Sequence, residues 1–192
     1  MKFKPIFIIA IVLALIIFAA LMWHFVYKNR FLKAIYPEHY SVYVDKYAQQ
    51  NNLDHYLIYA VIKNESSFKP KAYSSIGAMG LMQLTPQTFE WAQSKTPETE
   101  NYTNDDLYNP EINIHYGTLV LSSLIIEFGS VDTSLAAYHA GRGRVKGWLI
   151  DRRYSADGKK LDYIPYADTR AYVKKVLETR DIYKKLYDKN GN

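Results

Sequence analysis

The hydrophobic and polar positions divide the chain into one long apolar run and a remainder with helical periodicity. The run at residues 5–26 is uninterrupted and contains no Asp, Glu, Lys or Arg. About 22 residues at 1.5 Å rise each are long enough to cross a hydrocarbon core of about 30 Å. A cleavable signal peptide usually has a shorter apolar core and a small-x-small exit, whereas Ala19 and Ala20 are followed by bulky residues. We therefore expect residues 1–27 to form a retained transmembrane anchor, or an uncleaved signal, rather than a cleaved one.

The two flanks of the apolar run carry similar positive charge. Two lysines and the terminal amine precede it, and three basic residues follow it within residues 28–40. Because cytoplasmic flanks are normally the more basic ones, a near tie does not predict the orientation of the helix. We expect residues 28–40 to form a short juxtamembrane linker.

Residues 41–192 carry the 3.6-residue periodicity and the capping residues of a helical domain. Asp54 is a good N-cap for an apolar helix that runs to about Glu65, and Asn109-Pro110 begins a long helix that Gly129 ends. No stretch alternates between apolar and polar residues as a half-buried strand does. The fold class that we expect is therefore mainly α, a compact helical domain preceded by one N-terminal transmembrane helix. The other expected elements are a helix with Val42, Tyr43, Tyr47 and Ala48 on one face, a loop at 66–79, a helix after Thr85-Pro86, a polar stretch at 95–107, short helices at 132–140 and 144–149, a loop at 151–160 and a final helix at 166–187.

Charge is unevenly distributed along the domain, although the whole chain has a net charge of only +5. Residues 38–139 hold 5 basic and 12 acidic side chains, a net −7, whereas residues 140–192 hold 14 basic and 7 acidic ones, a net +7. A basic final third suits an anionic polymer such as nucleic acid, lipid headgroups or a carboxylate-bearing cell-wall glycan. It equally suits a solvated, lysine-rich helix, so charge alone leaves the partner open.

Several kinds of chemistry are excluded by residues that the sequence lacks. The chain has no cysteine, which excludes disulfides, thiolate zinc sites and a cysteine nucleophile. It also contains no HExxH, no carboxylate cluster at metal-ligand spacing and no Gly-x-Ser-x-Gly element. We therefore expect no metal and no cofactor, and neither a metalloenzyme nor a serine hydrolase.

Glu65 is a candidate catalytic residue because of where it lies in the pattern. It follows Val61 and Ile62 in an apolar helix and precedes a loop rich in Gly and Ser. Apolar neighbours raise the pKa of a carboxyl towards the range useful to a general acid, and a helix C-terminus is an unfavourable place for a carboxylate. By position alone, an ordinary exposed glutamate is the more common explanation, so this assignment needs independent support.

Two further segments carry side chains suited to a carbohydrate. Residues 74–83 hold two glycines three apart and end in Gln83, whose amide can donate and accept hydrogen bonds as sugar hydroxyls and acetamides require. Residues 136–141 place small residues around Tyr138 and His139. Taken singly, the first segment is a tight turn, and the second is a core tyrosine beside a structural histidine.

Together these segments resemble the soluble lytic transglycosylase family, whose catalytic domain is similar to goose-type lysozyme. The resemblance covers roughly residues 56–187 and implies a lysozyme-like catalytic domain over residues 41–192. It rests on four blocks that occur in the expected order. The blocks are Glu65-Ser66-Ser67-Phe68; Gly77-Ala78-Met79-Gly80-Leu81-Met82-Gln83; Ala137-Tyr138-His139-Ala140-Gly141 with Gly143-Arg144-Val145; and Pro165-Tyr166-Ala167-Asp168-Thr169-Arg170-Ala171-Tyr172-Val173.

The resemblance implies roles for particular residues. Glu65 would be the catalytic acid and base, and Ser74 would lie close to it. Tyr172 would support the neighbourhood of the acid, and Asp162 lies where some relatives have a second acidic residue. The residues that we expect to bind substrate are Ser74, Met82, Gln83, Tyr138, His139, Asp162 and Tyr172.

Two positions depart from the pattern of the family. Many relatives have Asn where this chain has His139, which replaces an amide by an imidazole that titrates near neutral pH. Many also have Met where this chain has Thr85, which replaces an apolar side chain by a helix cap. Neither change involves the acid, so both bear on substrate preference rather than on activity.

The function that the resemblance implies is cleavage of the bond between N-acetylmuramic acid and N-acetylglucosamine in peptidoglycan, with 1,6-anhydro ends as products, for cell-wall remodelling. The expected partners are glycan strands and, through the N-terminal helix, the membrane. Because this polymer lies outside the cytoplasmic membrane, we expect a single-pass protein with its domain on the extracytoplasmic side. The alternatives are a hydrolytic muramidase like goose-type lysozyme and a non-catalytic wall-binding scaffold. Nucleic-acid binding is not expected, because the chain has no recognised motif for it.

Overall fold

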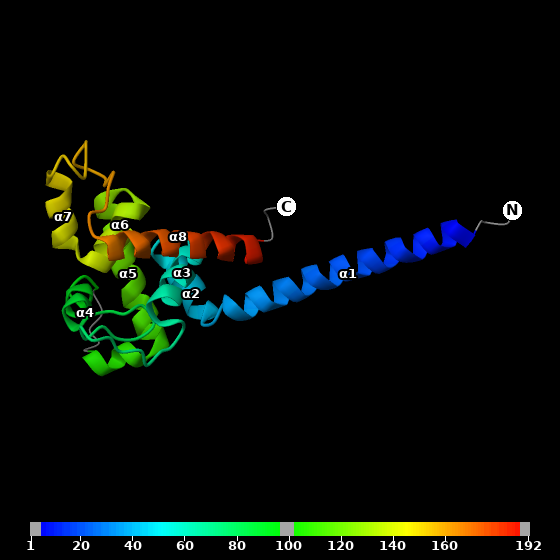
Figure 1. Cartoon of the computed structure of the whole chain (residues 1–192). Coiled ribbons are helices and arrows are strands. Elements are labelled where there is room, and N and C mark those ends of the chain that lie inside the picture. Colours follow the sequence, from blue (N-terminus) through cyan, green and yellow to red (C-terminus); the bar gives the residue numbers. More distant parts are fainter. Residues whose placement is uncertain (1–4, 97–101, 189–192) are drawn as a thin grey trace. The chain divides into compact units, whose positions relative to one another are not determined.

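The computed structural model describes residues 5–96 and 102–188, and it divides the chain into two compact units, Met1–Pro37 and Glu38–Asn192 (Figure 1). The first unit consists of the helix α1, Pro5–Ile35. Within its stretch Phe7–Ile35, an 18-residue window has a mean hydropathy of 2.7 and is not buried, so the helix is long and apolar enough to cross a membrane. The helix continues to Ile35 and therefore includes the first part of the segment predicted as a linker at 28–40.

The second unit consists of helices joined by loops, as the periodicity predicted. Between residues 38 and 188, with 97–101 left out, the structure has no strand, and only isolated bridges join Tyr73 to Met79 and Met79 to Leu84. Its helices are α2 (Ser41–Gln50), α3 (His55–Ser66), α4 (Pro86–Gln93), the 3₁₀ helix η1 (Asn104–Tyr108), α5 (Pro110–Phe128), α6 (Val131–Ala140), α7 (Arg142–Ile150) and α8 (Ala167–Tyr187).

The predicted caps set where these helices begin and end. The side chains of Asp54, Thr85 and Asn109 accept hydrogen bonds from the backbone N–H groups at the starts of α3, α4 and α5. Each bond satisfies a donor that has no partner within its own helix. Gly129 ends α5 in the left-handed conformation, with φ of 61°, which glycine adopts without steric cost.

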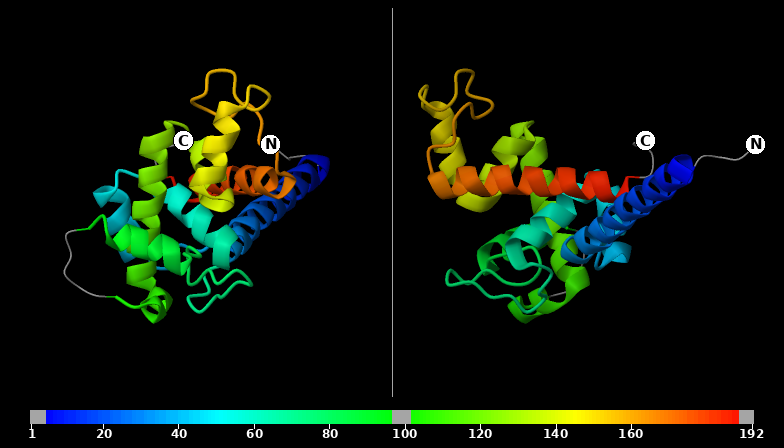
Figure 2. Two further views of the ribbon diagram at one scale, coloured as in Figure 1. Left: turned by 90° about the vertical axis from the view of Figure 1, so that its left-hand side faces the viewer. Right: turned by 45° about the vertical axis from the view of Figure 1, so that its right-hand side comes forward.

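Helix α5 lies at the centre of the domain, and α2, α4, α6 and η1 pack against it. Helix α8 packs along α3, as Figures 1 and 2 show from different directions. Buried aromatic pairs join these helices. Between α4 and α5, the ring of Phe89 meets that of Tyr116 edge-on with centroids 4.9 Å apart, and between α3 and α8, Tyr59 stacks on Tyr183 at 5.2 Å. The consequence for function is that the ends of α3, α6 and α8 converge.

The predicted apolar face of α2 was partly wrong. Val42 is 75% exposed, whereas Val44 is fully buried together with Tyr47 and Ala48. Val44 is three residues before Tyr47 and four before Ala48, the spacing of a single helix face. Val42 lies two residues from Val44 and therefore points away from that face.

Candidate active site

Glu65 lies in the last turn of α3, where α8 crosses it. The hydroxyl of Tyr172, in the second turn of α8, donates a hydrogen bond of 2.6 Å to Oε1 of Glu65. The two residues are 107 positions apart in the sequence, and the packing of α3 on α8 brings them together. The structure thus places Tyr172 next to the candidate acid, and the predicted supporting role of Tyr172 stays a prediction.

Burial gives Glu65 the protonation behaviour of a general acid. Removal from water raises its pKa from 4.5 to about 7, and the hydrogen bond from Tyr172 opposes part of that rise. Near neutral pH, both the protonated and the ionised carboxyl are therefore well populated. A pKa close to the working pH is what a residue needs if it is to give a proton and later take one back.

A second phenol lies beside the acid. The hydroxyl of Tyr138, in α6, donates a hydrogen bond of 2.7 Å to the carbonyl of Met82. Burial, followed by the negative charge of Glu65, raises the pKa of Tyr138 well above its usual value, and the same causes act on Tyr172. Both phenols therefore stay neutral and act as hydrogen-bond donors.

The loop between α3 and α4 carries three of the predicted substrate-binding residues, Ser74, Met82 and Gln83. Oγ of Ser74 accepts a hydrogen bond of 3.0 Å from the N–H of Ala78, which closes a tight turn. The amide of Gln83 donates to the carbonyls of Gly80, at 2.9 Å, and Ala72, at 3.3 Å. Both side chains shape the loop in this structure, and their predicted contacts with sugar stay predictions.

Met82 contributes its backbone rather than its side chain to the neighbourhood of Glu65. Its side chain is completely buried and lies against Gly117 of α5, where an added Cβ would be 2.8 Å from Cβ of Met82. Its carbonyl accepts the hydroxyl of Tyr138. Both the carbonyl and the N–H of Met82 already form hydrogen bonds within the protein, and the residue is fully buried, so its predicted contact with substrate stays a prediction.

Asn113 is a positioning residue that the sequence reasoning missed. It is fully buried in α5, and its amide donates to the carbonyls of Leu107, at 2.8 Å, and Met79, at 3.0 Å. Its Oδ1 accepts the N–H of Met82 at 2.7 Å. These bonds fix the loop on α5. The signal available in the sequence was a polar residue, Asn113, within an apolar helix shortly after its predicted cap, Asn109.

His139 and Asp162 have different surroundings. The imidazole of His139 stacks on the ring of Tyr172, with centroids 4.5 Å apart, and its Nδ1 is 3.2 Å from Oγ1 of Thr169. Asp162 is exposed in the loop after α7, where its Oδ2 accepts the N–H of Ala156 at 2.8 Å. His139 thus belongs to the cluster around Glu65, while the contacts of Asp162 are within its own loop.

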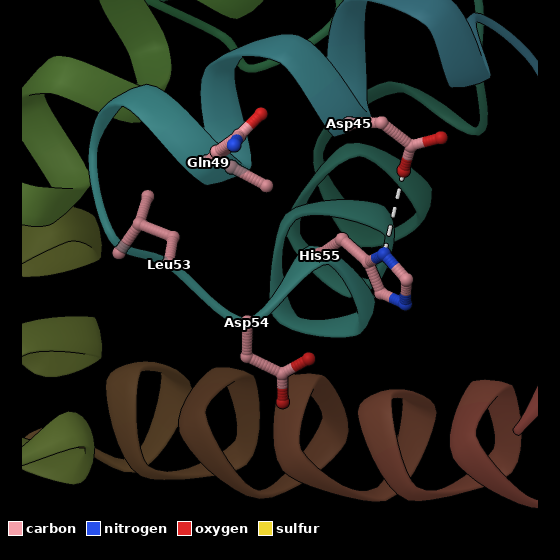
Figure 3. Close-up of a pocket in the computed structure, with 6 residues that line it drawn as sticks. Asp45, Gln49, Leu53, Asp54 and His55 are labelled. Atoms are coloured by element: carbon pink, nitrogen blue, oxygen red, sulfur yellow. Dashed lines mark ion pairs between the residues drawn. The ribbon is translucent and has the colours of Figure 1, made fainter. Parts of the chain in front are cut away.

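A surface hollow lies away from this cluster. Figure 3 shows it at the end of α2 and the start of α3, where Nδ1 of His55 is 3.3 Å from Oδ1 of Asp45. His55 begins α3 and Glu65 lies in its last turn, about 15 Å away at 1.5 Å per residue. None of the predicted site residues takes part in it. The hollow is lined by Asp45, Ala48, Gln49, Leu53, Asp54 and His55.

Across residues 5–96 and 102–188, no three His, Asp or Glu side chains are grouped as metal ligands would be. What the cluster offers is one carboxyl of raised pKa, two neutral phenols and an imidazole.

Comparison with known proteins identifies the family. The chain belongs to the transglycosylase SLT domain family, whose model matches residues 42–161. It is 33% identical over 148 residues to the soluble lytic murein transglycosylase of Escherichia coli K12, covering 76% of this chain and 23% of that protein. It is 29% identical over 170 residues to the membrane-bound lytic murein transglycosylase C of Glaesserella parasuis, covering 77% of this chain and 46% of that protein.

A solved structure shows the same fold. An inactive glutamate-to-glutamine variant of the lytic transglycosylase Slt from Pseudomonas aeruginosa superposes with a TM-score of 0.69 at 31% identity. The match covers 82% of this chain and 26% of that one. The predicted mainly α, lysozyme-like fold and the resemblance to the lytic transglycosylase family are therefore confirmed. The chain spans about a quarter of the length of these two soluble relatives.

Proposed function

We propose that the chain is a lytic transglycosylase that cleaves peptidoglycan between N-acetylmuramic acid and N-acetylglucosamine and leaves 1,6-anhydro ends. The observation that carries the proposal is the state of Glu65, a carboxyl with a pKa of about 7 beside two neutral phenols. The family and the activities by which its relatives are named supply the class of substrate.

The surroundings of Glu65 favour a mechanism that uses a single carboxyl. Most glycosidases use two carboxyl groups, one as acid and one as base or nucleophile. Among the described residues, burial and Tyr172 are the influences that shift the pKa of Glu65, and no second carboxylate is one of them. These surroundings suit a single group that serves in both steps.

One carboxyl can complete an internal transfer. Protonated Glu65 donates to the glycosidic oxygen, and the C1–O bond breaks as the acetamide of the muramic acid stabilises the cationic carbon. Ionised Glu65 then takes the proton from the C6 hydroxyl of the same sugar, and O6 bonds to C1. Glu65 ends protonated again, and no water is consumed. Tyr172 stabilises the ionised form between the steps through its hydrogen bond.

The experiment is a product analysis with the full chain in detergent micelles, wild type beside Glu65→Gln, on purified peptidoglycan. Wild type should release muropeptides whose ends are one water lighter than reducing ends in mass spectrometry. The variant should release none, in line with the inactive glutamine variant of the Pseudomonas relative. Reducing ends would instead identify a hydrolase, and binding without cleavage by wild type would identify a scaffold.

The proposal extends to location and biological role. An apolar helix at Phe7–Ile35 and the likeness to a membrane-bound transglycosylase support anchoring in the membrane. Because the substrate is extracytoplasmic, the domain lies outside and the N-terminus inside, in a single pass. There it would remodel the cell wall, with the basic residues of 140–192 available to the anionic polymer.

A further inference from the structure

The hydrogen bond that reaches Glu65 comes from a ring that is itself held in place. Tyr172 presents its hydroxyl to Glu65, and one face of its ring is covered by His139 at a centroid distance of 4.5 Å and an angle of 27°. The imidazole comes from the last turn of α6, a different helix from both partners of the bond. A nearly parallel cover of this kind limits how far the phenol can rotate.

The imidazole is in turn fixed on α8. Its Nδ1 is 3.2 Å from Oγ1 of Thr169, which is only 1% exposed. The N–H of Thr169 donates to Oδ1 of Asp168 at 2.8 Å, which holds the first turn of α8 in shape. Tyr138, the residue before His139, is bound to the carbonyl of Met82. The end of α6 is therefore attached both to the loop and to α8.

We propose that His139 is a positioning residue, which holds Tyr172 in the orientation that donates to Glu65. In this arrangement the imidazole acts through packing and its bond to Thr169, and it has no need to contact the sugar. Where this chain has His139, an asparagine would form the polar bond but could not cover an aromatic ring. This role of His139 deepens the proposed function, and its expected effect on turnover rests on that function.

The electrostatic surroundings agree with a packing role. The titratable groups facing this cluster are Tyr138 from α6 and Asp168 and Tyr172 from α8, around Glu65 of α3. Partial burial lowers the pKa of His139, and Asp168 opposes that shift. The imidazole is thus mainly neutral at neutral pH, so it adds no charge that would favour ionised Glu65.

The test measures the ionisation of Glu65 directly. Carboxyl carbons of ¹³C-labelled glutamate are titrated by NMR in the full chain in micelles, and Glu65 is assigned from its missing signal in Glu65→Gln. His139→Asn should raise the pKa of Glu65 by about half a unit to one unit, because a weakened charge-assisted bond stabilises the carboxylate less. His139→Phe keeps the ring cover and should restore a value close to wild type.

Two comparisons test whether His139 changes the pKa of Glu65 through Tyr172. In a Tyr172→Phe background, His139→Asn should add no further shift, because the bond that it positions is already absent. His55→Asn is the matched control: His55 also contacts a tyrosine ring, that of Tyr56, but at the opposite end of α3. This control should leave the titration of Glu65 unchanged.

A contact between His139 and substrate would give a different result. The pKa of Glu65 in the free protein would then be the same in wild type and His139→Asn, and the variant would raise KM without moving the pH profile. That result, or an additive shift in the Tyr172→Phe background, overturns the inference. Because the titration needs no substrate, it stands even if product analysis rejects the proposed function.

Discussion

At the scale of the residue, Glu65 combines a chemical advantage with a cost to the fold. Its pKa is about 7 in the folded protein against 4.5 as the reference value. The folded state therefore holds its proton more tightly than the unfolded chain. Its contribution to stability is fully present below pH 4.5 and is lost as the pH rises through 7, at about 1.4 kcal/mol for each pKa unit.

This sign leads to a prediction for Glu65→Gln. An amide does not titrate, so the variant should gain stability relative to wild type between pH 4.5 and pH 8, by up to roughly 3 kcal/mol. Thermal unfolding across this pH range measures the difference. Glu111→Gln is the control: the bond from Lys46 lowers the pKa of Glu111, so the stabilisation from Glu111 is lost only as the pH falls below 4.5, and this variant should differ from wild type by a constant amount across the range. A constant difference between Glu65→Gln and wild type would show that burial does not raise the pKa of Glu65.

The sequence predicted Glu65 as the candidate acid and Tyr172 as its neighbour, but not the contacts that Asn113 and His139 make around them. Glu65 belongs to a local block that the family shares, and an apolar helix precedes it. The bonds of Asn113 to Met82 and of His139 to Thr169 join residues 31 and 30 positions apart. No local pattern encodes a pairing that arises when two helices pack, so such residues are identified only in the folded structure.

At the scale of the element, helix boundaries were predictable because their causes are local. Asp54 and Asn109 cap helices through bonds that span two residues. The end of α1 at Ile35 and the burial of Val44 in place of Val42 were not predicted. The helical geometry of α1 continues beyond the end of its apolar run. On α2, the sequence alone does not distinguish Val42 from Val44, because the packing of neighbouring helices decides which of the two is buried.

Two glycines in helices provide a test of how α5 supports the site. Gly117 of α5 faces Met82, and an added Cβ would overlap Sδ of that side chain. Gly147 of α7 has no atom within 4 Å of an added Cβ. Alanine favours a helix over glycine by about 1 kcal/mol, whereas overpacking a core costs roughly 1–3 kcal/mol.

Gly147→Ala should therefore stabilise the domain by about 0.5–1 kcal/mol, and Gly117→Ala should destabilise it by roughly 1–2 kcal/mol. Urea unfolding of both variants measures the contrast. Gly117→Ala should also lower turnover, because displaced Met82 carries the carbonyl that accepts the Tyr138 hydroxyl. Equal stability of the two variants would mean that α5 and the loop tolerate the added methyl group, and the close packing would then have no role in the site.

At the scale of the whole molecule, the proposed function predicts the direction in which α1 would cross a membrane. Its flanking charges are nearly balanced, so they set no strong preference. The proposed substrate does set one, because peptidoglycan is reached only from the outer face of the membrane. Orientation is therefore a consequence of the proposed function that is measured independently of catalysis.

The absence of cysteine makes that measurement direct. Lys159→Cys places one thiol at an exposed position after α7, and Lys2→Cys places one before α1. In intact protoplasts, a membrane-impermeant maleimide should label the Lys159→Cys protein and leave the Lys2→Cys protein unlabelled until the cells are lysed. Wild type should stay unlabelled in both conditions. The intact mass of the labelled protein should include residues 1–37, since the proposed anchoring requires that α1 be retained. The reverse labelling pattern would place the domain in the cytoplasm, away from any glycan strand, and a mass without α1 would identify a cleaved leader.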